Sequence, residues 1–178
     1  MLGPFRRIVT AHDDRGKTYI QSDEQPDNKR PRAAGRITLH EIWSCAETPV
    51  KIARRGDAPP DDKPILMPPK GGNRFRMVDF PPLDTSGNMH RSETLEYCVM
   101  LEGETYLETE TDKTLVKAGD VVVLRGTNHA WSNRSGKWCR MAVIVVDGEF
   151  VDGLEGQGAY SAYAERMAAE ERARKGAS

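Results

Sequence analysis

The stretch that decides the fold is MHRSETLEYCVMLEGE, residues 89–104. Its central part, TLEYCVML (94–101), is rich in the β-branched, aromatic and aliphatic residues that favour strands. Side chains alternate between the two faces of a strand. The residues predicted to share one face, if the pleat continues, are His90, Ser92, Glu96, Cys98 and Met100.

Both faces of this strand carry apolar side chains. Leu95, Val99 and Leu101 occupy the second face, so the sequence predicts a sheet that is packed on both sides. Burial of a lone carboxylate is costly, and proteins usually solve it with a cation, a metal or a shifted pKa. We therefore expect Glu96 to have a partner.

Further short strands surround this segment, each bounded by Gly, Asn, Asp or Pro. They recur every 8 to 12 residues or so, with no helical pattern between them, which predicts an antiparallel sandwich or barrel. The predicted strands of the core span 74–80, 94–101, 104–111, 120–124, 128–133 and 139–146.

The ends of the chain are predicted to be peripheral to this core. Residues 1–57 contain three short strand candidates, at 6–10, 17–22 and 36–43. The segment APPDDKPILMPPKGG (58–72) has five prolines and two glycines and is predicted to be a long surface loop. The tail at 159–176 has helical periodicity and is predicted to be an α-helix.

Composition limits the classes of partner. The 178 residues include 26 Lys and Arg against 27 Asp and Glu, so no global field attracts nucleic acid or an anionic membrane. No apolar run approaches the length of a membrane span, and no secretory signal is visible. Three widely spaced cysteines suggest neither a disulfide framework nor a zinc site. We expect a cytoplasmic protein with a small-molecule partner.

A second stretch, AGDVVVLRGTNHAWSN (118–133), carries another candidate ligand, His129. Together the two stretches resemble the two sequence motifs of the cupin superfamily. In the first motif, His90 takes the place of the first histidine, and Glu96 is followed by six residues and then Gly103. The second motif is matched in order by Gly119, Asp120, Gly126, His129 and Asn133.

Two departures from the cupin pattern affect the predicted site. Ser92 stands where the first motif has its second histidine, and Leu124-Arg125 stands where a Pro-x pair is common in the turn. The resemblance covers residues 88–146. It implies an all-β, antiparallel double-stranded β-helix (jelly roll), with extra N-terminal strands and a C-terminal helix, as a single domain over 1–178 whose barrel core spans 73–147.

The resemblance also implies a metal site from which one histidine is missing. His90, Glu96 and His129 would form a two-histidine, one-carboxylate set, which leaves coordination positions open and is associated with non-haem Fe(II) oxygenases. Fe(II) is favoured, although Mn, Ni, Co or Zn would also suit these donors. The side chains expected to contact substrate are Ser92, Cys98, Met100, Trp131 and Arg125.

Three functions follow from this interpretation. The first is a metal-dependent oxygenase or dioxygenase acting on a small organic molecule. The second is a non-redox isomerase, dehydratase, decarboxylase or lyase that uses the metal as a Lewis acid. The third is a barrel that binds a small ligand without turnover. In each case the exposed strand edges and the C-terminal helix predict a homodimer.

Overall fold

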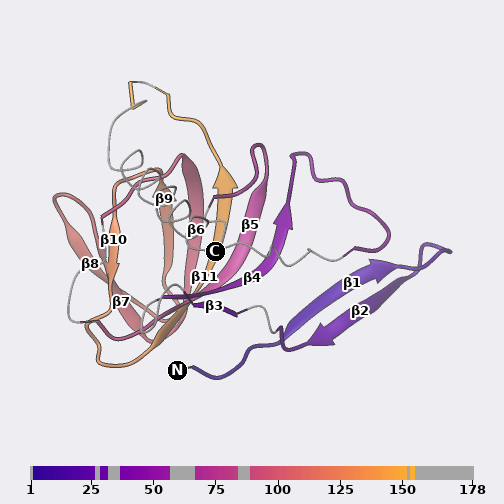
Figure 1. Ribbon diagram of the computed structural model, residues 1–178, viewed down its shortest axis with the longest axis horizontal. Helices are drawn as coiled ribbons and strands as arrows, with labels where there is room; N and C mark the ends of the chain where they lie inside the picture. Colours follow the sequence, from indigo (N-terminus) through magenta and orange to yellow (C-terminus); the bar gives the residue numbers. More distant parts are fainter. Residues whose placement is uncertain are drawn as a thin grey trace, which may run out of the picture.

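The computed structural model describes residues 2–26, 29–31, 37–56, 67–83, 89–151 and 153–154. Within these residues the chain forms eleven strands and no helix (Figure 1). The strands are β1 (Arg7–His12), β2 (Thr18–Glu24), β3 (Lys29–Pro31), β4 (Thr38–Cys45), β5 (Asn73–Phe80), β6 (Thr94–Glu102), β7 (Glu104–Glu108), β8 (Lys113–Lys117), β9 (Val121–Arg125), β10 (Ala130–Ser132) and β11 (Cys139–Asp147).

Two antiparallel sheets build the body of the molecule. The larger has the order β3-β4-β5-β11-β6-β9 and the smaller has the order β10-β7-β8. Their inner faces enclose a core to which β4, β5, β6, β8, β9 and β11 all contribute. The all-β, antiparallel jelly roll predicted from the sequence is therefore confirmed.

A separate two-stranded hairpin, β1-β2, stands away from the barrel (Figure 1). It is joined to the segment before residue 57 by a few hydrogen bonds, such as the one from the backbone N–H of His12 to the carbonyl of Arg54 at 2.8 Å. No helix in the described part of the chain is long and apolar enough to cross a membrane.

Some elements differ from the prediction. The segment predicted as one strand at 104–111 ends at Glu108, turns, and returns as β8, which was missed because lysines and threonines mask its alternation. The short β3 was also missed. The predicted helix at 159–176 and most of the loop at 58–72 lie outside the described residues.

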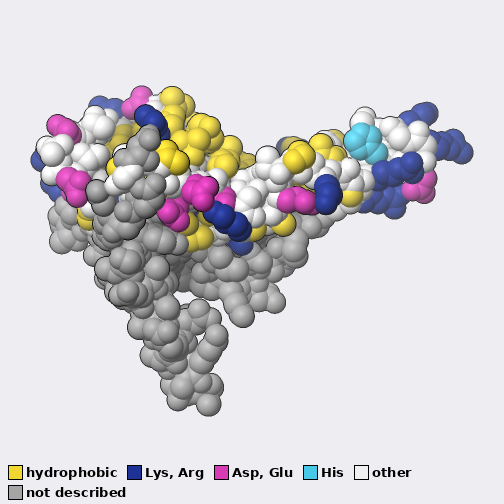
Figure 2. Space-filling model, turned by 90° about the horizontal axis from the view of Figure 1, so that it is seen from above, with side chains coloured by type: hydrophobic (Ala, Val, Ile, Leu, Met, Phe, Trp, Pro, Cys, Tyr) yellow, Lys and Arg dark blue, Asp and Glu magenta, His cyan; other side chains and the backbone are white. Residues whose placement is uncertain are grey.

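The prediction that β6 is covered on both faces is wrong. Thr94, Cys98 and Met100 point inward and are almost completely buried. On the other face, Val99 is 38% exposed and Leu101 is 45% exposed. We call this face of the larger sheet its outer face. Hydrophobic side chains gather on the barrel part of the surface, and others lie along the projecting hairpin (Figure 2).

A buried polar cluster holds the N-terminal segment against the other end of the outer face. Arg140 donates two hydrogen bonds to the carboxylate of Asp79, at 2.6 and 2.7 Å, and His40 Nε2 lies 3.1 Å from the same carboxylate. Arg140 also donates to the carbonyl of Gly3 at 2.9 Å, and the Phe5 ring packs edge-on against His40. The side chains of His40, Asp79 and Arg140 are all buried.

This cluster yields a prediction about stability. Burial opposes ionisation of Asp79, but hydrogen bonds from Arg140 and His40 outweigh it, so the pKa of Asp79 lies below its ordinary value. Asp79→Asn leaves the buried Arg140 guanidinium without its counter-charge and should lower the free energy of unfolding at pH 7 by about 3 to 5 kcal/mol. Urea denaturation measures this change.

The pH dependence tests the same interaction. Because the folded pKa of Asp79 is depressed, its stabilising effect is present above the unfolded pKa of about 4 and is lost as the pH falls below that. The difference between wild type and Asp79→Asn should therefore shrink at pH 3. Asp23→Asn, which breaks the exposed pair with Arg6, is the control and should change little. A gap that is the same at both pH values would contradict the prediction.

Candidate functional site

His90 and His129 are brought together by an isolated antiparallel β-bridge. The backbone N–H of each donates to the carbonyl of the other, at 2.9 and 2.8 Å. In such a hydrogen-bonded pair both side chains emerge on the same face. The centroids of the two imidazole rings are 4.4 Å apart. Two residues 39 positions apart in the sequence therefore share one site.

The turn before His129 sets the orientation of its ring. Nδ1–H of His129 donates to the carbonyl of Thr127 at 2.9 Å, which leaves the lone pair of the neutral imidazole on Nε2. A backbone carbonyl bound to the second ring nitrogen is the usual support of a metal-ligating histidine. Burial, and then the neighbouring His90, hold the pKa of His129 below its ordinary value, which favours this neutral form.

Glu96 lies on the inner face of β6, near His129 and Cys98. Its Oε1 accepts hydrogen bonds from Thr94 at 3.2 Å and from Ser92 at 3.4 Å, and the two hydroxyl groups are themselves 2.7 Å apart. Glu96 acts electrostatically on His129, opposing part of the lowering of its pKa. Ser92, at the position of the absent motif histidine, thus contacts the carboxylate directly.

Cys98 lies one inner-face position beyond Glu96 and is buried. Burial, and then the nearby Glu96 carboxylate, raise the pKa of its thiol far above the ordinary value. The thiol therefore remains protonated at neutral pH and forms a soft wall of the site rather than a nucleophile. All three cysteines of the chain are free.

The remaining predicted substrate contacts lie at different depths. The Trp131 ring lies 6.3 Å from that of His129 and 6.2 Å from that of Phe80, so it links the site to the core. Met100 is 1% exposed and belongs to the core. Arg125 pairs with Leu95 at the end of β9, and its side chain is exposed while that of its neighbour Leu124 is buried. Its role as a substrate contact stays a prediction.

The inner face of the barrel is divided into a polar half and an apolar half. Strand register places Val145 of β11 between Glu96 and Arg74, and Val143 between Cys98 and Arg76. Both arginines are buried, and both lie near Glu41, with Arg76 at 3.1 Å and Arg74 at 3.8 Å. The apolar half beyond them comprises Leu39, Val78, Phe80, Met100, Cys139 and Met141.

The sequence analysis missed Thr94, and for β5 it predicted only that Arg74 or Arg76 could reach the mouth of the barrel. Thr94 lies two residues before Glu96 in the same strand, so the two side chains point to the same face. This alternation could have predicted that Thr94 lies beside Glu96. Arg74 and Arg76 alternate with Phe75 and Met77 in β5. Which of the two sets faces inward depends on pairing with β11. Only the tertiary structure resolves that choice.

The donors have the chemistry of a metal site, although they do not converge on one point as they stand. Within the described ranges, no three His, Cys, Asp or Glu side chains form a group that could hold a metal ion. Glu96 is engaged by the Ser92 and Thr94 hydroxyl groups instead. A neutral imidazole with a supported Nδ1–H, a second imidazole beside it and a nearby carboxylate nevertheless fit a divalent first-row metal.

The comparison with known sequences identifies the family. The family described as "Cupin domain" matches residues 76–147. A relative from Aspergillus oryzae, the oryzines biosynthesis cluster protein J, is 41% identical over 159 residues, which cover 84% of this chain and 87% of the relative. The phomopsin biosynthesis cluster protein D of Diaporthe leptostromiformis is 32% identical over 165 residues, covering 85% and 87% of the two chains. The chain belongs to the cupin family.

Other similar proteins carry names that describe an activity or a fold. The cupin-domain-containing oxidoreductase virC of Hypocrea virens is 32% identical over 149 residues and covers 79% of this chain and 75% of its own. A solved structure, a cupin 2 conserved barrel domain protein from Salinispora arenicola, is 17% identical with a TM-score of 0.47. It covers 70% of this chain and 87% of its own.

The motif glycine before His129 yields a prediction about the site. Gly126 has φ +62°, and a Cβ built there would lie 2.6 Å from Cε1 of Phe150. Gly126→Ala therefore meets both backbone strain and a clash. We expect it to lower the free energy of unfolding by about 2 to 5 kcal/mol and to disturb the turn that carries His129.

The matched control is the other motif glycine, Gly119. It has φ +96°, but a Cβ there would meet nothing within 4 Å. Gly119→Ala should therefore lower the free energy of unfolding only by the cost of the backbone strain, about 1 to 2 kcal/mol. Chemical denaturation of both variants compares the two losses, and equal losses would show that the contact with Phe150 contributes nothing.

Proposed function

We propose that this chain is a metal-dependent cupin oxidoreductase that acts on a small organic substrate inside the barrel. The single observation that carries the proposal is the ring pair of His90 and His129, 4.4 Å apart at the polar end of the barrel and next to Glu96. These three side chains would hold one divalent metal. When bound, the metal would supply Lewis-acid polarisation and, as Fe(II), redox chemistry with dioxygen.

The protein's own groups would prepare this site. The Thr127 carbonyl keeps the lone pair of His129 on Nε2, and the lowered pKa of His129 keeps the ring neutral at physiological pH. The hydroxyl groups of Ser92 and Thr94 donate hydrogen bonds to the Glu96 carboxylate. If Glu96 turned toward a metal, these hydroxyl groups would become available to a substrate oxygen or a water molecule. Trp131 and Cys98 supply a nonpolar wall that excludes water.

The choice of reaction rests on the donor set and the relatives. Two imidazoles and one carboxylate suit Fe(II) and dioxygen, and relatives at 31% and 32% identity are named cupin-domain-containing oxidoreductases. Isomerisation, dehydration, decarboxylation or another lyase step is the second candidate. It is supported by the Ser92 hydroxyl group beside Glu96, which could hydrogen-bond a reacting oxygen while the metal acts as a Lewis acid.

Metal content tests the site directly. Purified without added metal, the wild type should carry close to one equivalent of a first-row divalent metal, measured by elemental analysis. His129→Ala and Glu96→Gln should lose most of it, about 10-fold or more, because each removes a ligand.

His12→Ala is the control, since His12 is an exposed residue of the hairpin strand β1. It should keep the wild-type metal content. If wild type, His129→Ala and Glu96→Gln all hold the same small amount of metal, the proposed site is wrong and the barrel functions without it.

Oxygen uptake separates the two reaction types. With Fe(II) supplied in excess, an oxygenase should consume dioxygen in proportion to substrate turnover, and His129→Ala should reduce the rate by at least about 100-fold. The measurement is an oxygen electrode trace alongside product formation. Confirmed turnover without oxygen uptake would assign the lyase or isomerase alternative instead.

A further inference from the structure

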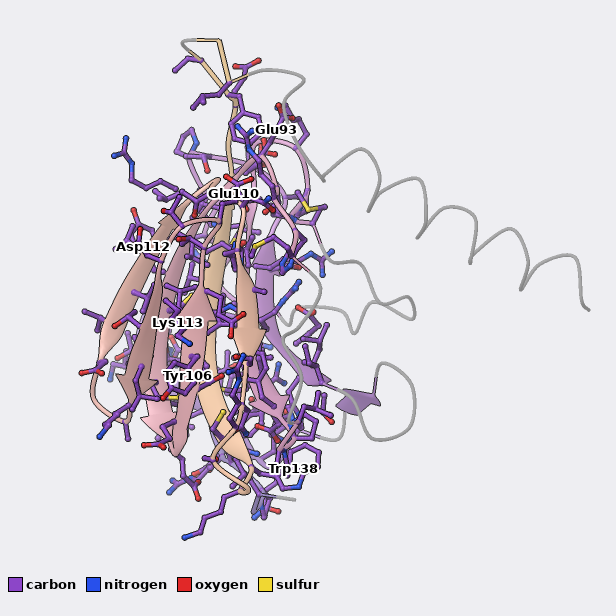
Figure 3. The ribbon with its side chains drawn as sticks, turned by 90° about the vertical axis from the view of Figure 1, so that its left-hand side faces the viewer. Glu93, Tyr106, Glu110, Asp112, Lys113 and Trp138 are labelled. Atoms are coloured by element: carbon purple, nitrogen blue, oxygen red, sulfur yellow. The ribbon has the colours of Figure 1, made fainter. Side chains whose placement is uncertain are left out.

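Three segments of the chain come together beside the histidine pair. They are the entry to β6 at 89–94, the turn at 125–129, and the C-terminal segment, which we define as residues 148–151 and 153–154. The first carries His90 and the second carries His129. Glu93 marks this end of the barrel in Figure 3, and Trp138 marks the opposite end. The positions of both imidazole rings therefore depend on how these segments are joined.

Arg91 is the side chain that joins all three segments. It follows His90 in the chain, and it is buried. Its Nε–H donates to the carbonyl of Gly126 at 2.9 Å, and its Nη2 donates to the carbonyl of Leu154 at 3.1 Å. Its Cζ lies 3.9 Å from the centre of the Phe150 ring. A guanidinium suits this place because its donors are fixed in one plane, whose face can stack on an aromatic ring.

The hydrogen bond to Gly126 reaches the ring of His129 through the backbone. Gly126 precedes Thr127, whose carbonyl accepts the hydrogen bond from Nδ1–H of His129. Arg91 therefore fixes the planar peptide group that leads into Thr127, and this limits the directions in which the next carbonyl can point. The tautomer and the orientation of the His129 ring thus depend on a side chain from the other motif.

The C-terminal segment packs against the same residues. The backbone N–H of Gly148 donates to the carbonyl of Glu93 at 2.9 Å. A Cβ built on Gly126 would lie 2.6 Å from Cε1 of Phe150 and 3.2 Å from the carbonyl oxygen of Ser92. Phe150 is therefore packed against the turn as well as against the guanidinium. We call this unit the Arg91 clasp: the Arg91 guanidinium, the Phe150 ring and the carbonyls of Gly126 and Leu154.

The direct link between the two histidines is short. His90 and His129 form an isolated bridge of two backbone hydrogen bonds rather than part of a longer ladder. Such a pair contributes little net stability, because each hydrogen bond replaces hydrogen bonds to water. The clasp adds two charge-assisted hydrogen bonds and a cation–π contact beside this bridge.

From these contacts we propose that Arg91 is a positioning residue of the metal site and acts with the C-terminal segment to hold His90 and His129 in place. Imidazoles that are held in this way lose less freedom when a metal binds, so the clasp should raise the affinity of the site. The inference rests on the proposed function, since it assigns the clasp to the same site. Its tests therefore include one that needs no metal.

The first test is the tautomer of His129 in the metal-free full chain. Long-range ¹H–¹⁵N NMR spectra of the imidazole rings, recorded at about pH 8 where the rings are neutral, show which nitrogen carries the proton. The wild type should show the Nδ1–H form alone, as the hydrogen bond to Thr127 requires. Arg91→Met keeps a long side chain but removes both hydrogen bonds, and should give the Nε2–H form in at least about 10% of molecules.

The second test is the affinity for Co(II), measured by titration of the metal-free chain and followed by visible absorption. Arg91→Met should weaken binding by about 10- to 100-fold, the range expected when the support of a ligating histidine is lost. Arg91→Lys keeps the charge but not the planar fork of donors, and should weaken binding by only about 3-fold. Phe150→Leu removes the aromatic ring and should have a similar effect, again about 3-fold.

Arg134→Met is the matched control. Arg134 also lies over an aromatic ring, that of Tyr106, at 5.8 Å, and it forms an ion pair with Glu108 at 2.8 Å. Tyr106 belongs to β7 of the smaller sheet (Figure 3). The control should keep both the Nδ1–H tautomer and the Co(II) affinity of the wild type. Circular dichroism should show that each variant is folded.

The outcomes separate the clasp from the metal site. A folded Arg91→Met variant that binds Co(II) as tightly as the wild type overturns the proposal, and so does an equal loss of affinity in Arg134→Met. If Arg91→Met does not fold, unchanged tautomer and affinity in both Arg91→Lys and Phe150→Leu overturn it. If the wild type binds no Co(II), the proposed function is wrong, and the tautomer comparison alone decides whether Arg91 positions His129.

Discussion

Antiparallel pairing of β6 with β11 on one side and β9 on the other is the constraint on which the rest of this structure depends. The register of these three strands decides which side chains enter the barrel. With Glu96, Cys98 and Met100 inside, Tyr97, Val99 and Leu101 must point outward. A shift of one residue would exchange the two sets, placing a carboxylate on the surface and three large apolar side chains in the barrel.

The same pairing explains why the barrel interior has two chemical halves. Inner positions at one end of β5, β6 and β11 carry apolar side chains such as Val78, Met100 and Met141. Farther along the same strands stand Glu96 and the arginines Arg74 and Arg76, with Glu41 of β4 beside them. Burial of these groups is tolerated because each lies beside hydroxyl groups or an opposite charge. The apolar half supplies the stability that permits a polar half.

The site and the outer face are coupled through one strand. The chain needs alternation in β6 to bring Glu96 toward the histidines, and the consequence is a row of apolar side chains on the opposite face.

The sequence by itself determined the fold class and supplied the candidate site residues, whose role stays a prediction. The evidence for them consists of local patterns, which can be read directly from the sequence. These are the alternation in residues 94–101, the glycines at 103, 119 and 126, and the spacing of His90, Glu96 and His129. The positive φ angles of the three glycines show why those positions recur in the motif. Asn133, the last residue of the second motif, closes a turn: it accepts hydrogen bonds from Ser135 and donates one to the carbonyl of Lys137.

Only the tertiary structure decided the rest, because it depends on which strands become neighbours. The bridge that places the two imidazole rings 4.4 Å apart joins residues 39 positions distant, and the support of Glu96 by Ser92 and Thr94 depends on how the chain enters β6. The inward direction of Arg74 and Arg76 and the exposure of Val99 and Leu101 follow from register and from what covers each face. No property of these residues taken alone distinguishes a covered face from an open one.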